Sequence, residues 1–380
     1  MSRFVRPRVA ASLVLAALVM PLRPVVAAVP GSAARIVGGT TADAGHYRFM
    51  ASLQKAAGGG VAAHFCGATL VDPQWVLTAA HCVEGLTPAD FRIVVGATRL
   101  SAGDGEVRRP AEIRADPGYD GDATHGADIA LVRLSAPVDD IEPIEPVRAS
   151  DRAHWEAGDP AEVIGWGVTS EAGTVASDDL RWAGVAIASD AAMSAPGAYG
   201  AKFLASDMVG AGRAIGGLDA CYGDSGGPLV VGIGKPGRRQ VGVVSFGKGC
   251  GRVGYPGVYS RLGDGRVRSF ADSLVPLRVA PVRVREGRAA RFTLTVSRPS
   301  TLPVAVNWAT VGQTATAGAD FTSTRGVAHL APGEMVATVD VPVTADTAAE
   351  RDETFRLLLS QPVNTWLAAD SAVATIVDGG

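Results

Sequence analysis

The stretch Asp219–Val230, DACYGDSGGPLV, decides the fold of the 380-residue chain. At its centre Ser225 stands in the pattern G-x-S-x-G, which in several hydrolases marks a nucleophilic serine. One such arrangement needs a helix after the serine and a histidine later in the chain. Here Gly226-Gly227-Pro228 disfavours a helix, and the only later histidine, His329, belongs to a different region. That arrangement is therefore excluded.

Two segments upstream supply partners for the serine. Leu77–Cys82 reads LTAAHC and contains His81, and Gly126–Leu134 reads GADIALVRL and contains Asp128. A serine hydroxyl is a poor nucleophile at neutral pH, so a base must take its proton. Histidine suits that role because its ordinary pKa is about 6.5, and a carboxylate can orient the imidazole. Each motif alone is usually structural, so the prediction depends on the three together.

These motifs follow one another in an order that is similar to one protein family. The order His81, Asp128, Ser225, with IVGG at Ile36–Gly39, resembles the trypsin-like serine proteases of the chymotrypsin family. The resemblance spans residues 36–274 and implies an all-β fold, with two antiparallel β-barrels of the chymotrypsin fold and a C-terminal helix. It also implies a serine endopeptidase in which Ser225 attacks the substrate, His81 is the base and Asp128 orients it, through an acyl-enzyme.

The same resemblance assigns residues around the nucleophile. The backbone N–H groups of Gly223 and Ser225 would form the oxyanion hole. The S1 pocket, which holds the side chain before the cleaved bond, would be formed by Asp219, Ser245, Gly247 and Gly257. Asp219 at the pocket floor favours Arg or Lys in that position, because an unpaired buried carboxylate is costly until a cation arrives.

Alternatives to this interpretation stay open at this point. Asp219 would be a solvated loop residue in one of them, since aspartate is mostly exposed in proteins. In another, the enzyme has a chymotrypsin- or elastase-like preference, against which Asp219 argues. A third is a non-catalytic binding protein built on a protease scaffold. Such proteins usually lose a triad residue, whereas this chain has all three.

The N-terminal segment has the pattern of a secretory leader. Arg3, Arg6 and Arg8 precede an apolar run at Val9–Met20, so residues 1–27 are expected to be a signal peptide. The apolar run is too short for a transmembrane span, which needs about 20 residues. The sequence therefore predicts a secreted, extracellular protein.

The segment after the leader predicts an activation step. Residues 28–35 would be an activation peptide, and cleavage after Arg35 would free the amino group of Ile36. In the family that ammonium pairs with the carboxylate beside the nucleophile, here Asp224, because a buried charge needs a partner. The resemblance therefore implies a zymogen.

The chain contains four cysteines, and export favours disulfide bonds between them. Three pairings are open from the count alone, and a metal site is disfavoured because no C-x-x-C pair occurs. The family resemblance implies the pairs Cys66–Cys82 and Cys221–Cys250. Gly210 stands where many members have a further cysteine, so we expect a looser loop near the pocket.

Residues 282–380 differ in character from the region before them. Short strand-like runs alternate with turn residues, which is typical of an Ig-like β-sandwich. VPLRVAP, residues 275–281, is expected to be a linker because of its prolines. ATAGADF at Ala315–Phe321 and ERDETFRLLLS at Glu350–Ser360 resemble a Calx-beta domain.

Calcium-binding members of that family gather acidic residues at one end of the sandwich. The matching residues here are Glu286, Asp320, Asp346, Glu350 and Asp378. Ala345 and Gly379-Gly380 stand where further acids are common, and calcium needs about six to eight oxygen ligands. Two interpretations stay open: a weak calcium site, and a spacer or adhesion module with solvated acids.

The composition limits the partners. The net charge of −3 suggests no polyanionic ligand, so we expect protein or peptide substrates and no nucleic acid or membrane partner. We expect a monomer. The triad chemistry requires no cofactor, and calcium would concern only the C-terminal domain.

Overall fold

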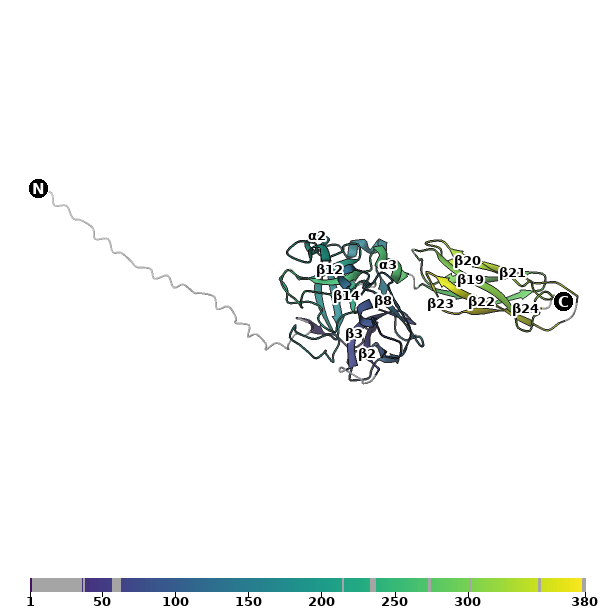
Figure 1. Ribbon diagram of the computed structural model, residues 1–380, viewed down its shortest axis with the longest axis horizontal. Coiled ribbons are helices and arrows are strands. Elements are labelled where there is room, and N and C mark those ends of the chain that lie inside the picture. The colour runs from purple at the N-terminus through teal and green to yellow at the C-terminus, as the bar shows by residue number, and fades with distance from the viewer. Residues whose placement is uncertain are drawn as a thin grey trace. The chain divides into compact units, whose positions relative to one another are not determined.

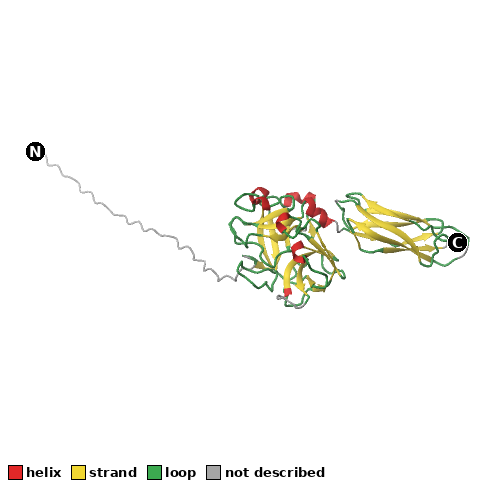
Figure 2. Cartoon of the chain, viewed as in Figure 1, coloured by secondary structure: helices red, strands yellow, loops and turns green. Residues whose placement is uncertain are grey.

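The computed structural model describes residues 1, 36, 38–56, 63–213, 215–232, 237–272, 275–300, 302–347 and 350–377 (Figure 1). The predicted signal peptide after its first residue, the activation peptide and Arg35 lie outside the described residues. Strands dominate the described part, as the sequence predicts, and helices are short (Figure 2). Among the described residues, no helix has the length and apolar character needed to cross a membrane.

The first barrel sheet carries the strands between residues 50 and 134, paired antiparallel in the order β6-β5-β2-β3-β4-β8-β7. They are β2 (Met50–Lys55), β3 (His64–Asp72), β4 (Trp75–Thr78), β5 (Phe91–Val95), β6 (Glu106–Arg108), β7 (Pro110–Ala115) and β8 (Ala130–Leu134). Strand β4 is buried along its whole length, because moving its apolar side chains from water into the core is favourable. Helix α1 (Ala80–Val83) begins just after β4, so the sheet sets the position of His81.

The second barrel sheet closes on itself. Six strands follow one another in the order β11-β10-β13-β14-β15-β12, and β12 pairs back with β11. They are β10 (Pro160–Gly165), β11 (Arg181–Ala188), β12 (Met208–Gly212), β13 (Pro228–Val231), β14 (Arg239–Phe246) and β15 (Gly257–Arg261). Two short strands, β1 (Thr40–Thr41) and β9 (Glu145–Pro146), pair with β11 and β14. The predicted pair of antiparallel barrel sheets is confirmed.

Helices occupy the connections. Helix α3 (Gly265–Asp272) follows β15 and confirms the predicted closing helix. Helix α2 (Asp190–Met193) follows β11. Short 3₁₀ helices are η2 (Ala123–His125), η3 (Ala149–His154) and η4 (Gly200–Lys202). Of these, η2 ends just before Asp128, so that β8 and the turn together fix this side chain.

The C-terminal region is the predicted β-sandwich. One sheet pairs in the order β21-β18-β16-β23 and the other in the order β17-β24-β22-β19-β20. The strands are β16 (Pro276–Val279), β17 (Val282–Arg285), β18 (Ala289–Val296), β19 (Val304–Gly312), β20 (Arg325–Leu330), β21 (Val336–Pro342), β22 (Glu353–Val363), β23 (Trp366–Leu367) and β24 (Ser371–Val377). Inside the sandwich, Phe321 stacks on Phe355 with ring centroids 4.3 Å apart.

The expected linker is corrected by this topology. Residues 276–279 form β16, which pairs with β18 and β23 and so belongs to the sandwich. Leu277 and Val279 alternate inward and are buried, which is the period of a strand. Pro276 fits because proline is tolerated as the first residue of a strand.

Candidate active site

A histidine and a carboxylate meet between the two barrel sheets. His81 Nδ1 lies 2.8 Å from Asp128 Oδ2, and the backbone N–H of His81 donates to Asp128 Oδ1 over 3.0 Å. Ser245 Oγ donates to Asp128 Oδ2 over 2.5 Å. These bonds orient the imidazole so that Nε2 is left for a reacting group.

The charges of this pair shift its titration. Burial opposes an imidazolium, but the hydrogen bond and charge of Asp128 outweigh it, so the pKa of His81 lies above its ordinary value. Burial would raise the pKa of Asp128, but its bonds to His81 and Ser245 hold the pKa below the ordinary value. Asp128 therefore stays ionised at neutral pH and stabilises a proton on His81.

Ser225 is brought to the same region by the backbone of β3. The N–H of Gly67 donates to the Ser225 carbonyl over 2.8 Å, and the Gly67 carbonyl accepts from Thr78 Oγ1 over 2.8 Å. Thr78 ends β4, directly before the helix that carries His81. Within the described residues, no hydrogen bond joins Ser225 Oγ to His81, a contact that is often long before substrate binds.

The backbone at Gly223 is held by a buried relay that the sequence did not suggest. His64 Nε2 lies 3.0 Å from the Gly223 carbonyl, and His64 Nδ1 lies 2.8 Å from Ser52 Oγ. Gln54 Nε2 donates to Ser52 Oγ over 3.2 Å. Burial lowers the pKa of His64 to about 4, so the ring is neutral and one nitrogen donates while the other accepts. The relay therefore fixes the peptide groups beside Ser225.

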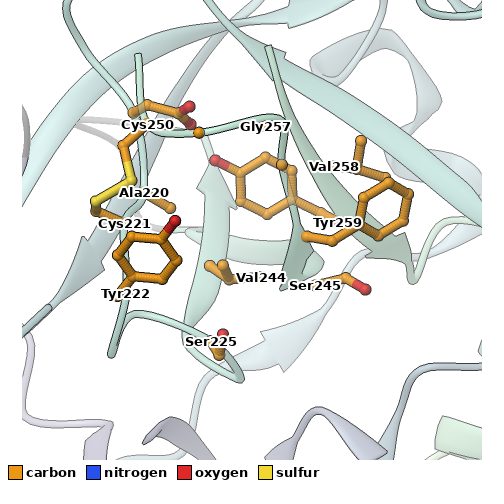
Figure 3. Close-up of a pocket in the computed structure, with 14 residues that line it drawn as sticks. Ala220, Cys221, Tyr222, Ser225, Val244, Ser245, Cys250, Gly257, Val258 and Tyr259 are labelled. Atoms are coloured by element: carbon orange, nitrogen blue, oxygen red, sulfur yellow. A yellow bond between two sulfur atoms is a disulfide. The ribbon is translucent and has the colours of Figure 1, made fainter. Parts of the chain in front are cut away.

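A cavity of about 240 Å³ opens beside Ser225 (Figure 3). It is lined by β14 and β15 residues, by the segment 219–222 and by the turn 247–250. Figure 3 shows Ser225 on one side of this cavity and the Cys221–Cys250 disulfide on another. The residues predicted for the S1 pocket all line it: Asp219, Ser245, Gly247 and Gly257.

Asp219 is the charged group of the cavity. It is 2% exposed, and its Oδ2 accepts the Gly251 N–H over 2.9 Å. Its Oδ1 is buried and has no hydrogen-bond partner among the described residues. Burial raises the pKa of Asp219 to about 6. A side chain at Gly257 would place its Cβ 2.7 Å from that free oxygen, so glycine keeps the oxygen accessible.

Asp224 lies beyond the cavity, fully buried. Its Oδ1 accepts the Gly167 N–H over 2.7 Å, and its Oδ2 accepts the Cys221 N–H over 2.9 Å. Burial raises the pKa of Asp224 to about 7. The Ile36 side chain is also fully buried and packs in the core of the second barrel sheet. The structure therefore brings Ile36 inside the protein, although Arg35 before it is outside the described residues.

The disulfides match the predicted pairs. Cys66 bonds to Cys82 and Cys221 bonds to Cys250, and no free cysteine is present among the described residues. The first bond joins β3 to the helix of His81, and the second joins the Ser225 segment to the cavity wall. Since both sulfurs beside His81 are in a disulfide, they cannot act as thiolate metal ligands there.

The acidic end of the sandwich brings together two of the predicted acids and one that was not predicted. Asp320, Glu350 and Glu353 offer carboxylate oxygens within 4.8 Å of one another. Burial and these neighbours, with Glu286, raise the pKa of Glu353. The sequence interpretation missed Glu353, whose place in strand β22 shows no ligand-like spacing. Of the other predicted acids, Asp346 is exposed and Asp378 lies outside the described residues.

Comparisons with known proteins agree with these two regions. Residues 36–266 match the family model described as Trypsin, and residues 272–380 match the Calx-beta domain. A trypsin from Saccharopolyspora erythraea is 41% identical over 228 residues, which cover 60% of this chain and 93% of that protein. Trypsin-1 from Astacus astacus is 35% identical over 232 residues, covering 60% of this chain and 95% of that protein. Trypsin epsilon from Drosophila erecta is 37% identical over 226 residues, covering 60% of this chain and 82% of that protein.

Proposed function

Since the chain belongs to the trypsin family of serine endopeptidases and carries a Calx-beta domain, we propose that it cleaves peptide bonds after Arg or Lys. The observation that carries this specificity is the free Oδ1 of Asp219 in the cavity beside Ser225. A guanidinium or ammonium would supply the missing partner of this buried oxygen. A Phe or Ala side chain would leave the oxygen unpaired, which costs binding energy.

In the proposed mechanism Ser225 Oγ attacks the carbonyl carbon of the bond to be cleaved, and His81 Nε2 takes the hydroxyl proton. Asp128 holds the Nδ1–H through the 2.8 Å contact and stabilises the imidazolium. The N–H groups of Gly223 and Ser225 stabilise the oxyanion. His81 then gives the proton to the leaving amine, and an acyl-enzyme forms. Water, deprotonated by His81, attacks the acyl carbon; the ester bond to Ser225 Oγ breaks, and His81 returns the proton to that oxygen.

We also propose that the protein is made as a zymogen. Asp224 is buried, its oxygens face backbone N–H groups, and its pKa is raised to about 7. The burial that raises this pKa destabilises the ionised carboxylate, so a cation placed beside it would be stabilising. Cleavage after Arg35 would create an ammonium at Ile36, whose side chain is already inside the second barrel sheet. Arg35 itself fits the proposed specificity, so a second copy could perform the cleavage.

The proposed setting is extracellular, with a monomeric enzyme. The support is the leader pattern at residues 1–27 and the two disulfides, which persist in oxidising compartments. For the sandwich we propose weak calcium binding, in the range of about 10⁻⁴–10⁻³ M typical of extracellular modules, because the acids are few. Catalysis would not depend on it.

The direct test is a peptide library that varies the residue before the cleaved bond, cut by protein cleaved after Arg35. We expect cleavage after Arg and Lys. A preference for Phe or for Ala would instead support the chymotrypsin- or elastase-like alternative. Ser225→Ala should lower the rate by about 10⁶, because triad members act as a unit. If the wild-type protein binds peptides without cleaving them, the non-catalytic alternative holds.

A further inference from the structure

The segment between β11 and β12 lies beside the S1 cavity, where Tyr199 contacts Phe246 and lies near Gly247. It begins with helix α2, whose N-terminus is capped by Ser189 Oγ, accepting from the Ala192 N–H over 3.2 Å. The last helical residue, Met193, is fully buried. Asp190 at the start of the helix pairs with the buried Arg261 of β15 over 2.5 Å. The segment is thus held at two points on the barrel wall.

Met193 fills the space above a glycine in that wall. A Cβ at Gly210 would lie 2.4 Å from Met193 Sδ and 2.6 Å from Cγ and Cε. Gly210 is in β12, between Ala188 of β11 and Val258 of β15. A buried cluster surrounds the contact, with Phe203, Met208 and Val258. The Met193 thioether therefore occupies the space that a side chain at residue 210 would fill.

Met193 is hydrogen-bonded through its backbone to Tyr199, whose side chain contacts both cavity walls. The backbone N–H of Tyr199 donates to the Met193 carbonyl over 3.1 Å. The Tyr199 hydroxyl donates to the Pro256 carbonyl over 2.7 Å and accepts the Lys248 N–H over 3.2 Å. Lys248 follows the wall glycine Gly247, and Pro256 precedes the wall residue Gly257. One phenol thus ties the two walls together.

We propose that Met193 is a positioning residue for substrate specificity: seated on Gly210, it fixes Tyr199, which sets the separation of the S1 walls. The ligand class, a side chain with a terminal cation, rests on the proposed function. Strand β14 ends at Phe246 and β15 begins at Gly257, so the two walls meet through the connection of residues 247–256, which the phenol of Tyr199 contacts at both of its ends.

The experiment uses the activated full-length chain and compares Met193→Ala with Met50→Ala, a matched change at another fully buried methionine, on β2. Benzamidine, an aryl amidine, probes the S1 pocket, and a small organophosphorus fluoride reports the reactivity of Ser225 without filling the pocket. We expect Met193→Ala to raise the benzamidine Ki and the KM for an Arg peptide about tenfold, since small misplacements of a binding group are costly. The kcat and the phosphorylation rate should stay within about twofold, because the triad is held separately. Met50→Ala should lower the Tm and leave the Ki unchanged.

A second pair of variants tests the seat itself. Gly210→Ala inserts a methyl group into the space of Met193 and should also raise the Ki. In the double variant Met193→Ala/Gly210→Ala the methyl group has room, so the Ki should lie closer to wild type than the two single effects predict. If Met193→Ala does not fold, Met193→Leu carries the same test, with an expected rise in the Ki of about threefold.

Two results would overturn the proposal: an unchanged Ki in Met193→Ala, or a phosphorylation rate that falls in proportion to probe affinity. Failure of the proposed Arg or Lys specificity is separable from both. It would appear in the wild-type enzyme as a preference for an uncharged residue, and the KM for that preferred substrate would then replace benzamidine as the readout on Met193.

Discussion

Carboxylates are arranged in opposite ways in the second barrel and at the acidic end of the sandwich. In the barrel, Asp219 and Asp224 are both buried; each oxygen of Asp224 accepts a backbone N–H group, whereas Asp219 accepts one only at Oδ2. In the sandwich, Asp320, Glu350 and Glu353 cluster within 4.8 Å at partly exposed positions. Water solvates a buried carboxylate poorly, so such a group attracts a cation strongly. The carboxylates of an exposed cluster are solvated, and their attraction for a cation is weaker. We therefore expect the single buried carboxylate of Asp219 to affect cation binding more than the three solvated carboxylates do.

The largest test of this contrast is Asp219→Ser. The substitution removes the buried charge from the cavity, and losing such a pair is worth roughly 3–5 kcal/mol. The preference for Arg over Phe substrates, measured as the ratio of kcat/KM values, should fall by about 10³. Asp139→Asn, at an exposed aspartate, is the control and should leave the ratio unchanged. A ratio that survives Asp219→Ser would place the recognition of the cation elsewhere.

Asp224→Asn should come next in size. In protein cleaved after Arg35 the variant leaves the Ile36 ammonium without its buried partner. The active conformation should be depopulated by about 10²-fold or more, measured as the loss of kcat/KM. The uncleaved chain provides the control, since its activity should be low with either residue. Equal activity of cleaved Asp224→Asn and cleaved wild type would contradict the proposed activation.

The pH dependence sharpens the contrast further. Because the pKa of Asp219 is raised to about 6, its carboxyl is ionised above pH 6 and protonated below it. The affinity for benzamidine should be constant above that pH and fall by about tenfold per pH unit below it. An uncharged aryl ligand should show no such fall. A benzamidine Ki that is flat down to pH 4.5 would mean that Asp219 keeps an ordinary pKa.

The smallest effect is expected from calcium at the sandwich. For a Kd of about 1 mM, 10 mM calcium should stabilise the domain by about 1.4 kcal/mol, seen as a rise in its Tm. Glu353→Gln should abolish the rise, whereas Glu334→Gln, in the turn after β20, should keep it. Amidolytic activity should not change with calcium. No shift in the wild-type protein would favour the spacer interpretation, and saturation at micromolar calcium would show more ligands than we count.

The fold class could be predicted from the sequence because the motifs around His81, Asp128 and Ser225 are short continuous segments that occur in a characteristic order. The GDSGGP and TAAHC segments carry their own turns and short helix, and the cysteine beside His81 pairs as the family resemblance implies. The separation of β16 from the preceding helix was harder, because VPLRVAP has the composition of a linker and one of its two pairing partners, β23, comes 90 residues later. Strand pairing at that range leaves no local signal.

The missed parts of the site share one cause. His64 contacts the Gly223 carbonyl across 159 residues of sequence, and Met193 meets Gly210 through the shape of its thioether. The position of neither residue relative to the sequence motifs predicts these contacts. A buried histidine is usually structural, and a methionine usually fills space, so only the observed contacts distinguish these two from ordinary core residues.

The closure of the second barrel sheet has a consequence for how the protein opens. Its ring of β11, β10, β13, β14, β15 and β12 has no free edge, whereas the first sheet ends at β6 and β7. Amide protons at unprotected edges exchange with solvent through local opening, so exchange should begin in the first sheet. That sheet positions His81 and Asp128, while the ring lines the cavity. On gradual denaturation the protein should therefore lose the His81–Asp128 pair, and with it catalysis, at denaturant concentrations where the cavity still binds cationic ligands.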